Sequence, residues 1–169
     1  NVFIGHKAGE DMAGGQNSVH VGFEAGLVTN NSSNVFVGAY AGKNATGFET
    51  VGVGKNAHRD CTGDKNVAIG VQALDASGDA DNCVAVGFQA LTAATNNSNI
   101  GIGYRAGNTI TTGYSNVLIG SDADGVADKI NQIAIGQGAV TDDSNKVRLG
   151  NTSITKIDGE VACNASSDA

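Results

Sequence analysis

The chain is poor in the residues that build large mixed cores. Its 169 residues include no proline and no tryptophan, and aromatic side chains make up only 5%. Basic residues are also scarce: 10 Lys and Arg stand against 17 Asp and Glu, giving a net charge of −7. This balance disfavours a nucleic-acid or anionic-membrane partner, because such surfaces are bound through basic side chains. No apolar run is long enough to cross a bilayer, and none resembles a signal peptide.

Cysteine is scarce as well. Cys61, Cys83 and Cys163 form no CxxC pair and have no histidine at metal-ligand spacing. We therefore expect buried free thiols rather than disulfides or a metal site, as in a protein that assembles in a reducing cytosol.

What the sequence does contain is glycine, 25 residues of it, within a phrase that recurs about every 16 residues. The phrase is a small polar residue, a Val or Ile, any residue, a second Val or Ile, and Gly. A fixed period over the whole chain is typical of a stacked solenoid. The copies end at Gly5, Gly22, Gly38, Gly54, Gly70, Gly87, Gly103, Gly120 and Gly136, with an altered last copy at Gly150.

Each phrase predicts a short parallel strand followed by a glycine bend. Its two Val or Ile residues share one face of the strand, because side chains alternate along a strand. We expect this face to form a thin core, and the middle residue, such as Gly52 or Ala68, to face a neighbouring chain. An Ala shortly after the Gly would sit where the coil turns back. Such a thin core leaves a lone chain marginally stable, so we expect an oligomeric rod of about 45 Å.

Two families resemble this pattern over about residues 1–140. The Asn-Val-Ala-Ile-Gly phrase at residues 66–70 resembles the heads of trimeric autotransporter adhesins, which are left-handed parallel β-rolls packed as three chains. Longer units at residues 66–74 and 84–91 resemble repeats of bacteriophage tail fibres. These resemblances imply an all-β repeat solenoid: a trimeric parallel β-roll with about 16-residue coils, followed by a short intertwined β stem.

The carboxyl end adds a third resemblance. Residues 145–169, with Leu149-Gly150-Asn151 and a final Ser-Asp-Ala, are similar to the junction before the intramolecular chaperone of endosialidase-type tail spikes and fibres. This implies a β-roll repeat domain at 1–140, a stem at 141–167 and the start of the chaperone at 168–169. The chaperone of that family cuts itself off between Ser and Asp, which here would be Ser167 and Asp168. The chain also opens inside a repeat, and we expect it to be a piece of a longer polypeptide.

The resemblances together imply a structural and host-attachment segment of a viral, phage-type tail fibre or appendage. Its expected partners are two further copies of itself, other fibre segments and a host cell-surface receptor or glycan, with no nucleic acid and no membrane insertion. We expect a place in the virion after assembly in the host cytoplasm, no cofactor, and no enzyme activity beyond self-cleavage by a downstream chaperone. The alternatives are the head of a trimeric adhesin on a bacterial surface and, less favoured, a left-handed β-helix acyltransferase.

Candidate sites are few. Carbohydrate sites usually combine aromatic rings with amides and charges, and we select Tyr40, Tyr104 and Arg105 as receptor contacts; the alternative is that these rings fill grooves between coils or chains. The three histidines, at positions 6, 20 and 58, have no nucleophile or carboxylate partner in sequence, which favours structural roles.

Metal sites are weakly indicated. The Asp122-Ala123-Asp124-Gly125 stretch begins like a calcium loop but lacks the later ligands that such a loop needs. An ion on a threefold axis could instead be held by His20, His58 or Asp143. We expect no metal.

Overall fold

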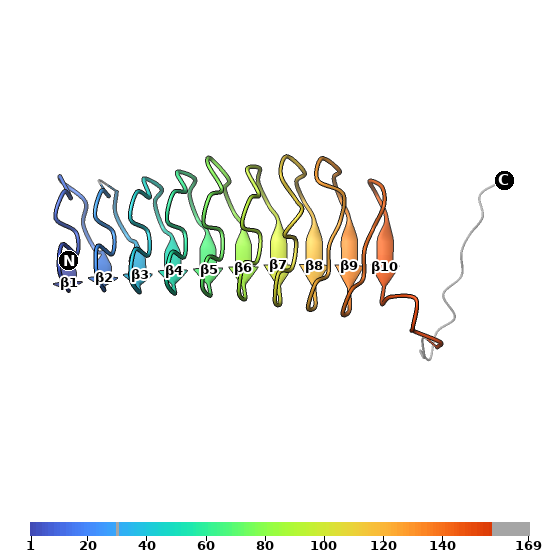
Figure 1. Ribbon diagram of the computed structural model, residues 1–169. Coiled ribbons are helices and arrows are strands. Elements are labelled where there is room, and N and C mark those ends of the chain that lie inside the picture. Colours follow the sequence, from blue (N-terminus) through green and yellow to red (C-terminus); the bar gives the residue numbers. More distant parts are fainter. Residues whose placement is uncertain (30, 157–169) are drawn as a thin grey trace.

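The computed structural model describes residues 1–29 and 31–156 and is a stack of coils along one axis, an all-β solenoid (Figure 1). Its strands pair in chain order, each parallel to the next, in one ten-stranded sheet. This confirms the predicted solenoid of about 16-residue coils. The strands are β1 Val2–Ile4, β2 Val19–Val21, β3 Val35–Val37, β4 Val51–Val53, β5 Val67–Ile69, β6 Val84–Val86, β7 Ile100–Ile102, β8 Val117–Ile119, β9 Ile133–Ile135 and β10 Val147–Leu149.

The register places the same position of each phrase side by side in neighbouring coils. Val51 pairs with Val67, and Gly52 pairs with Ala68. Each coil, named here after the strand that begins it, forms backbone hydrogen bonds with both neighbours, as in Gly70 N–H to the Val53 carbonyl at 2.8 Å. The described residues contain no helix, and so none that could span a membrane.

The closing glycine of each phrase is required by the stacking. Gly54 has φ of +132°, and a Cβ built on it would lie 2.5 Å from the carbonyl oxygen of Gly70 in the next coil. A side chain there would meet both an unfavourable backbone conformation and a neighbouring backbone atom. The glycine period of the sequence is therefore the period of the coils.

The interior of the coils is filled by the middle residue of each strand, which corrects the prediction for this position. Phe36, Ala68 and Leu118 are fully buried within the chain. The Val and Ile residues on either side point outward, and Ile69 and Ile102 are 41% and 38% exposed. The prediction was wrong because alternation shows which residues share a face but not which face is inside. The alanines after the closing glycines lie in the turns, as predicted, and most are buried, for example at positions 25, 41, 57, 73 and 90, whereas Ala8 of the first coil is half-buried.

Large and small side chains alternate between two interior positions. In the β3 coil the middle residue is Phe36, and the fourth residue after the closing glycine is Gly42, where a Cβ would lie 2.5 Å from the Phe36 ring. The β5 coil has the reverse arrangement, with Ala68 on the strand and a fully buried Leu74 at the turn. Each of these two coils thus holds one large side chain at one of the two positions, which keeps its interior close-packed. The β7 coil has Gly101 and Gly107 at the two positions, and Leu91 and Leu118 of the neighbouring coils lie against them.

A ladder of buried amides runs beside this apolar interior. The residue before each strand is often Asn, and Asn34, Asn66, Asn99 and Asn116 are fully buried. The Asn116 carboxamide donates to the Lys129 carbonyl at 3.1 Å and accepts from the backbone N–H of residue 132, in the next coil, at 2.8 Å. These bonds satisfy polar backbone groups that the narrow coil hides from water.

The sheet continues into the segment predicted as the stem. β10 pairs with β9 in the same parallel register, Val147 opposite Ile133. The rest of the predicted stem from residue 157, the proposed cleavage residues Ser167 and Asp168, and Cys163 lie outside the described residues.

Candidate ligand-binding site

A groove lies between two consecutive turns of the solenoid, in the segments that follow β3 and β4. Its volume is about 540 Å³. Both segments come after a closing glycine, so the groove lies on the side of the rod formed by the turns, here called the turn wall, and not on its strands. Its lining residues are Tyr40, Lys43, Asn44, Lys55, Asn56, Arg59 and Asp60.

The coil period brings these residues together. Lys43 and Arg59 are 16 positions apart, as are Asn44 and Asp60, so each pair occupies equivalent places in neighbouring coils. The backbone holds this alignment, because the Asn44 N–H donates to the Arg59 carbonyl at 2.8 Å. One wall of the groove is therefore fixed to the other by the solenoid itself.

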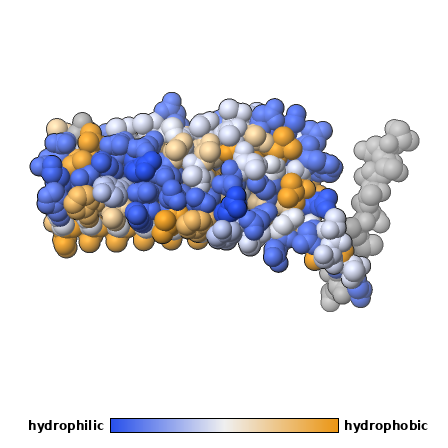
Figure 2. Space-filling view, in the orientation of Figure 1, coloured by the Kyte–Doolittle hydropathy of each residue, from blue (hydrophilic) through white to orange (hydrophobic). Residues whose placement is uncertain are grey.

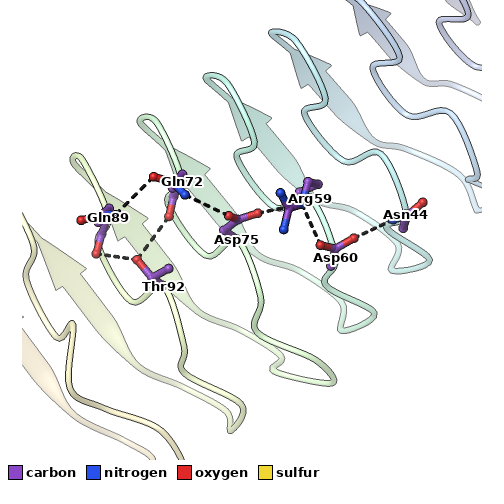
Figure 3. A network of polar contacts seen from close by, with 7 residues as sticks. All are labelled: Asn44, Arg59, Asp60, Gln72, Asp75, Gln89 and Thr92. Carbon is purple, nitrogen blue, oxygen red and sulfur yellow. Dashed lines mark hydrogen bonds and ion pairs between the residues drawn. The ribbon is translucent and has the colours of Figure 1, made fainter.

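Arg59 is held by two carboxylates from the turn wall (Figure 3). Its Nε lies 2.7 Å from Asp60 Oδ2 and 3.2 Å from Asp75 Oδ1. The second contact is an ion pair without hydrogen-bond alignment, since Asp75 Oδ1 has no hydrogen-bond donor among the described residues. Burial raises the pKa of Asp75, against the attraction of Arg59. Partial burial also acts to raise the pKa of Asp60, but hydrogen bonds from Asn44, at 2.6 Å, and Arg59 keep it below its usual value.

The polar network continues for two further coils (Figure 3). Gln72 lies 3.5 Å from Asp75 Oδ2 through its Nε2 and accepts from Gln89 at 3.2 Å. The Thr92 hydroxyl donates to the Gln89 carbonyl at 2.8 Å. Arg59 is thus held within a chain of contacts that crosses consecutive turns, from Asn44 to Thr92.

The opposite side of the groove is less constrained. Lys43 pairs with Glu24 at 2.7 Å, and its Nζ lies 5.2 Å from the centre of the Tyr40 ring. The Tyr40 ring meets Phe23 edge-on at 5.3 Å. Lys55 is exposed and forms no ion pair within residues 1–29 and 31–156. The lining therefore carries three cations and one carboxylate, in a chain whose overall charge is −7.

The structure does not bring the predicted receptor contacts into one site. Tyr40 lines the groove, whereas Tyr104 and Arg105 follow β7, four coils away. Tyr104 is 50% exposed and stacks on Phe88 with the ring centres 5.4 Å apart. This aromatic pair follows the solenoid period, so stacking between coils accounts for its arrangement.

Sequence reasoning missed the basic residues of the groove. Lys43, Lys55 and Arg59 look like scattered surface charges along the chain. The signal that could have found them is the 16-residue spacing of Lys43 and Arg59, combined with Tyr40 in the same coil. Reading the charges by coil position instead of by chain order would have grouped them.

The two histidines considered for a threefold-axis ion lie inside the coil. His20 and His58 are fully buried, and their rings lie 5.3 Å and 6.0 Å from that of Phe36. Burial lowers the pKa of each to about 4. Neither can reach an axis outside its own chain, which corrects that hypothesis. Asp143 is exposed.

The suspected calcium loop is occupied by internal contacts. Asp124 accepts from the Thr109 hydroxyl at 2.9 Å and from the Gly125 N–H at 2.9 Å. Burial raises the pKa of Asp124. In the part of the chain that the structure describes, no three His, Cys, Asp or Glu side chains are grouped to hold a metal ion.

The thiols of Cys61 and Cys83 are free and buried, as predicted. Burial raises the pKa of Cys61 to about 12. Cys83 stands in the ladder of buried residues before the strands, where its Sγ lies 3.4 Å from the Asn99 N–H. Both are structural residues of the coil.

Comparisons with protein-family models, with curated proteins and with solved structures find no match to this chain.

Proposed function

We propose that this chain is a structural and host-attachment segment of a phage-type tail fibre or appendage, in which three copies form a rigid shaft. The observation that carries the proposal is the outward face of the sheet. In coil after coil, its Val and Ile side chains are left uncovered by the chain itself. The most exposed of them are Val2, Ile4, Ile69, Ile102, Ile135, Val147 and Leu149.

This apolar ladder runs the length of the sheet. Figure 2 shows an apolar row along the left half of the lower edge of the rod, on the side where Figure 1 places the first strands. Apolar surface of this kind marks an interface in a soluble protein. A solenoid of 10 strands with a continuous outer ladder needs a cover of matching length.

Another copy of the same chain provides that cover. Its ladder repeats with the same strand spacing, about 4.8 Å per coil, so every Val and Ile can meet an equivalent side chain. Burying them would add about 1.5–3 kcal/mol for each side chain that becomes fully covered. The resemblance to trimeric adhesin heads and phage fibres supports three copies over two.

The groove on the turn wall supports the attachment part of the proposal. The strands carry the apolar ladder, whereas the groove is formed by residues 40–44 and 55–60, in the turns that follow β3 and β4. Association through the strands therefore leaves the groove available to a host receptor. Three parallel copies would present it three times, and binding would gain from avidity.

Sedimentation velocity of an interface variant tests the shaft. Ile102→Lys places a charge in the outer ladder without touching the coil interior, and we expect it to dissociate the trimer. Thr112→Lys is the matched control, because Thr112 is exposed in a loop away from the strands. A trimer that persists unchanged in Ile102→Lys would contradict an interface on this face.

A further inference from the structure

We propose that the groove between the β3 and β4 coils binds an anionic sugar, a pyranose that carries a carboxylate or a phosphate group. The inference rests on the proposed host-attachment function, whose receptor chemistry it names. It does not depend on how many copies form the shaft.

Charge is the first argument. Three of the chain's ten basic residues, Lys43, Lys55 and Arg59, line this one groove. The only acidic residue of the lining is Asp60. Carboxylates balance two of these cations, since Lys43 pairs with Glu24 and Arg59 pairs with Asp60 and Asp75. Lys55 is therefore the cation left to attract an anion to this groove.

The state of the three cations is the second argument. Lys55 is exposed and unpaired in the described part of the chain, so its ammonium group can meet a ligand without breaking an ion pair. Arg59 uses its Nε for Asp60 and Asp75, and no contact of its two terminal nitrogens is present among the described residues. A guanidinium held at Nε presents those nitrogens as a fixed fork, the geometry that suits a carboxylate or phosphate.

The rest of the lining suits a sugar ring. Tyr40 supplies an aromatic wall and a hydroxyl, and Phe23 supports its ring from the edge at 5.3 Å. Asn44 and Asn56 add amide groups that can donate to and accept from sugar hydroxyls. The volume of about 540 Å³ accommodates one or two sugar units. Inorganic anions would leave the amides and the ring unused.

Isothermal titration of the complete chain with four probes tests the proposal: N-acetylneuraminate, glucuronate, glucose 6-phosphate and glucose. We expect an acidic sugar to bind with Kd on the order of 1 mM per site, and glucose at least about tenfold more weakly. Binding of the carboxylated sugars alone, or of the phosphorylated sugar alone, identifies the source of the anionic group. Equal affinity for glucose, or no binding of any acidic sugar, would overturn the proposal.

Matched lysine variants locate the site. Lys55→Gln removes the unpaired cation and should weaken binding of the acidic sugar about tenfold. Lys65→Gln makes the same change in charge at an exposed lysine outside the groove and should leave the affinity unchanged. Equal affinities of Lys55→Gln and the unchanged chain would contradict the assignment.

Sedimentation of the same samples separates this inference from the proposed shaft. A trimer that binds no acidic sugar would refute the groove alone. A monomer that binds acidic sugar, with the loss expected in Lys55→Gln, would refute the trimeric shaft and leave the groove standing.

Discussion

Two interior positions of a coil, the middle residue of the strand and the fourth residue after the closing glycine, are expected to share one space. This can be tested in the β3 coil by removing the large side chain from the first position and placing one at the second. Phe36→Ala removes a fully buried ring and should cost about 3–5 kcal/mol. Gly42→Leu alone places a side chain against that ring, since even a Cβ would lie 2.5 Å from it. Overpacking of this kind costs about 1–3 kcal/mol, and the left-handed conformation of Gly42 adds about 1–2 kcal/mol for a Leu.

The double variant should be much less damaged than the sum of the two single variants. Ala on the strand with Leu at the turn is the native arrangement of Ala68 and Leu74, and Leu74 adopts the same left-handed conformation, with φ of 50°. The Leu would fill the space that the ring leaves. We expect the two changes to offset each other by at least about 2 kcal/mol.

Amide hydrogen exchange of the β3 coil is the suitable assay, because a solenoid opens locally and its stability is distributed along the repeats. All variants are compared at one protein concentration, so that association contributes equally. Phe48→Ala is the control, since Phe48 is 47% exposed and its loss should change little. Costs that add within about 0.5 kcal/mol would refute the idea that the two positions share one interior space.

Three further predictions concern the coil itself. Burial holds the pKa of His20 and His58 near 4, so between pH 6.5 and 4 the unfolded chain binds protons that the folded chain does not. The free energy of unfolding should therefore fall as the pH falls through that window, by up to about 3 kcal/mol per histidine. Urea unfolding across this range, compared with a His20→Phe/His58→Leu variant that lacks this part of the slope, checks the effect; identical slopes would contradict it. Gly54→Ala should cost about 3 kcal/mol or more, measured as a drop in thermal midpoint, because its Cβ meets the next coil's backbone; a stable variant would show that the coils can shift apart. Asn116→Ala should cost about 1–3 kcal/mol in urea unfolding, because it leaves the buried backbone N–H of Gln132 unpaired, while the Lys129 carbonyl keeps the Gln132 side chain as a donor. The exposed Asn131→Ala should cost little, and equal losses would argue against the ladder.

The fold was predictable because each coil needs certain residue types at fixed positions, and these recur in the sequence with the period of the coils. Gly54 and its equivalents must be glycine for coils to stack, and the Val or Ile residues beside Gly52 mark a strand at each turn. Both signals can be recognised in a single sequence without relatives, so the strand positions and the coil period could be predicted from it.

The inside and the outside of the coil were not predictable from alternation. Small residues such as Ala68 and Gly52 seemed suited to an outer contact, but they are small because a coil of 16 residues has a narrow interior. The missing signal is the covariation within a coil: a large strand residue such as Phe36 accompanies Gly42, and Ala68 accompanies Leu74. The groove was missed for a related reason, since its lining joins residues from two coils.

The native mass of the chain tests the central proposal most directly. If the outer Val and Ile ladder is covered by copies of the same chain, sedimentation equilibrium should give three times the 16.9 kDa chain mass, and circular dichroism should show β structure in that species. A folded monomer at every concentration would contradict the shaft, because the apolar ladder would then be stable in water without a cover.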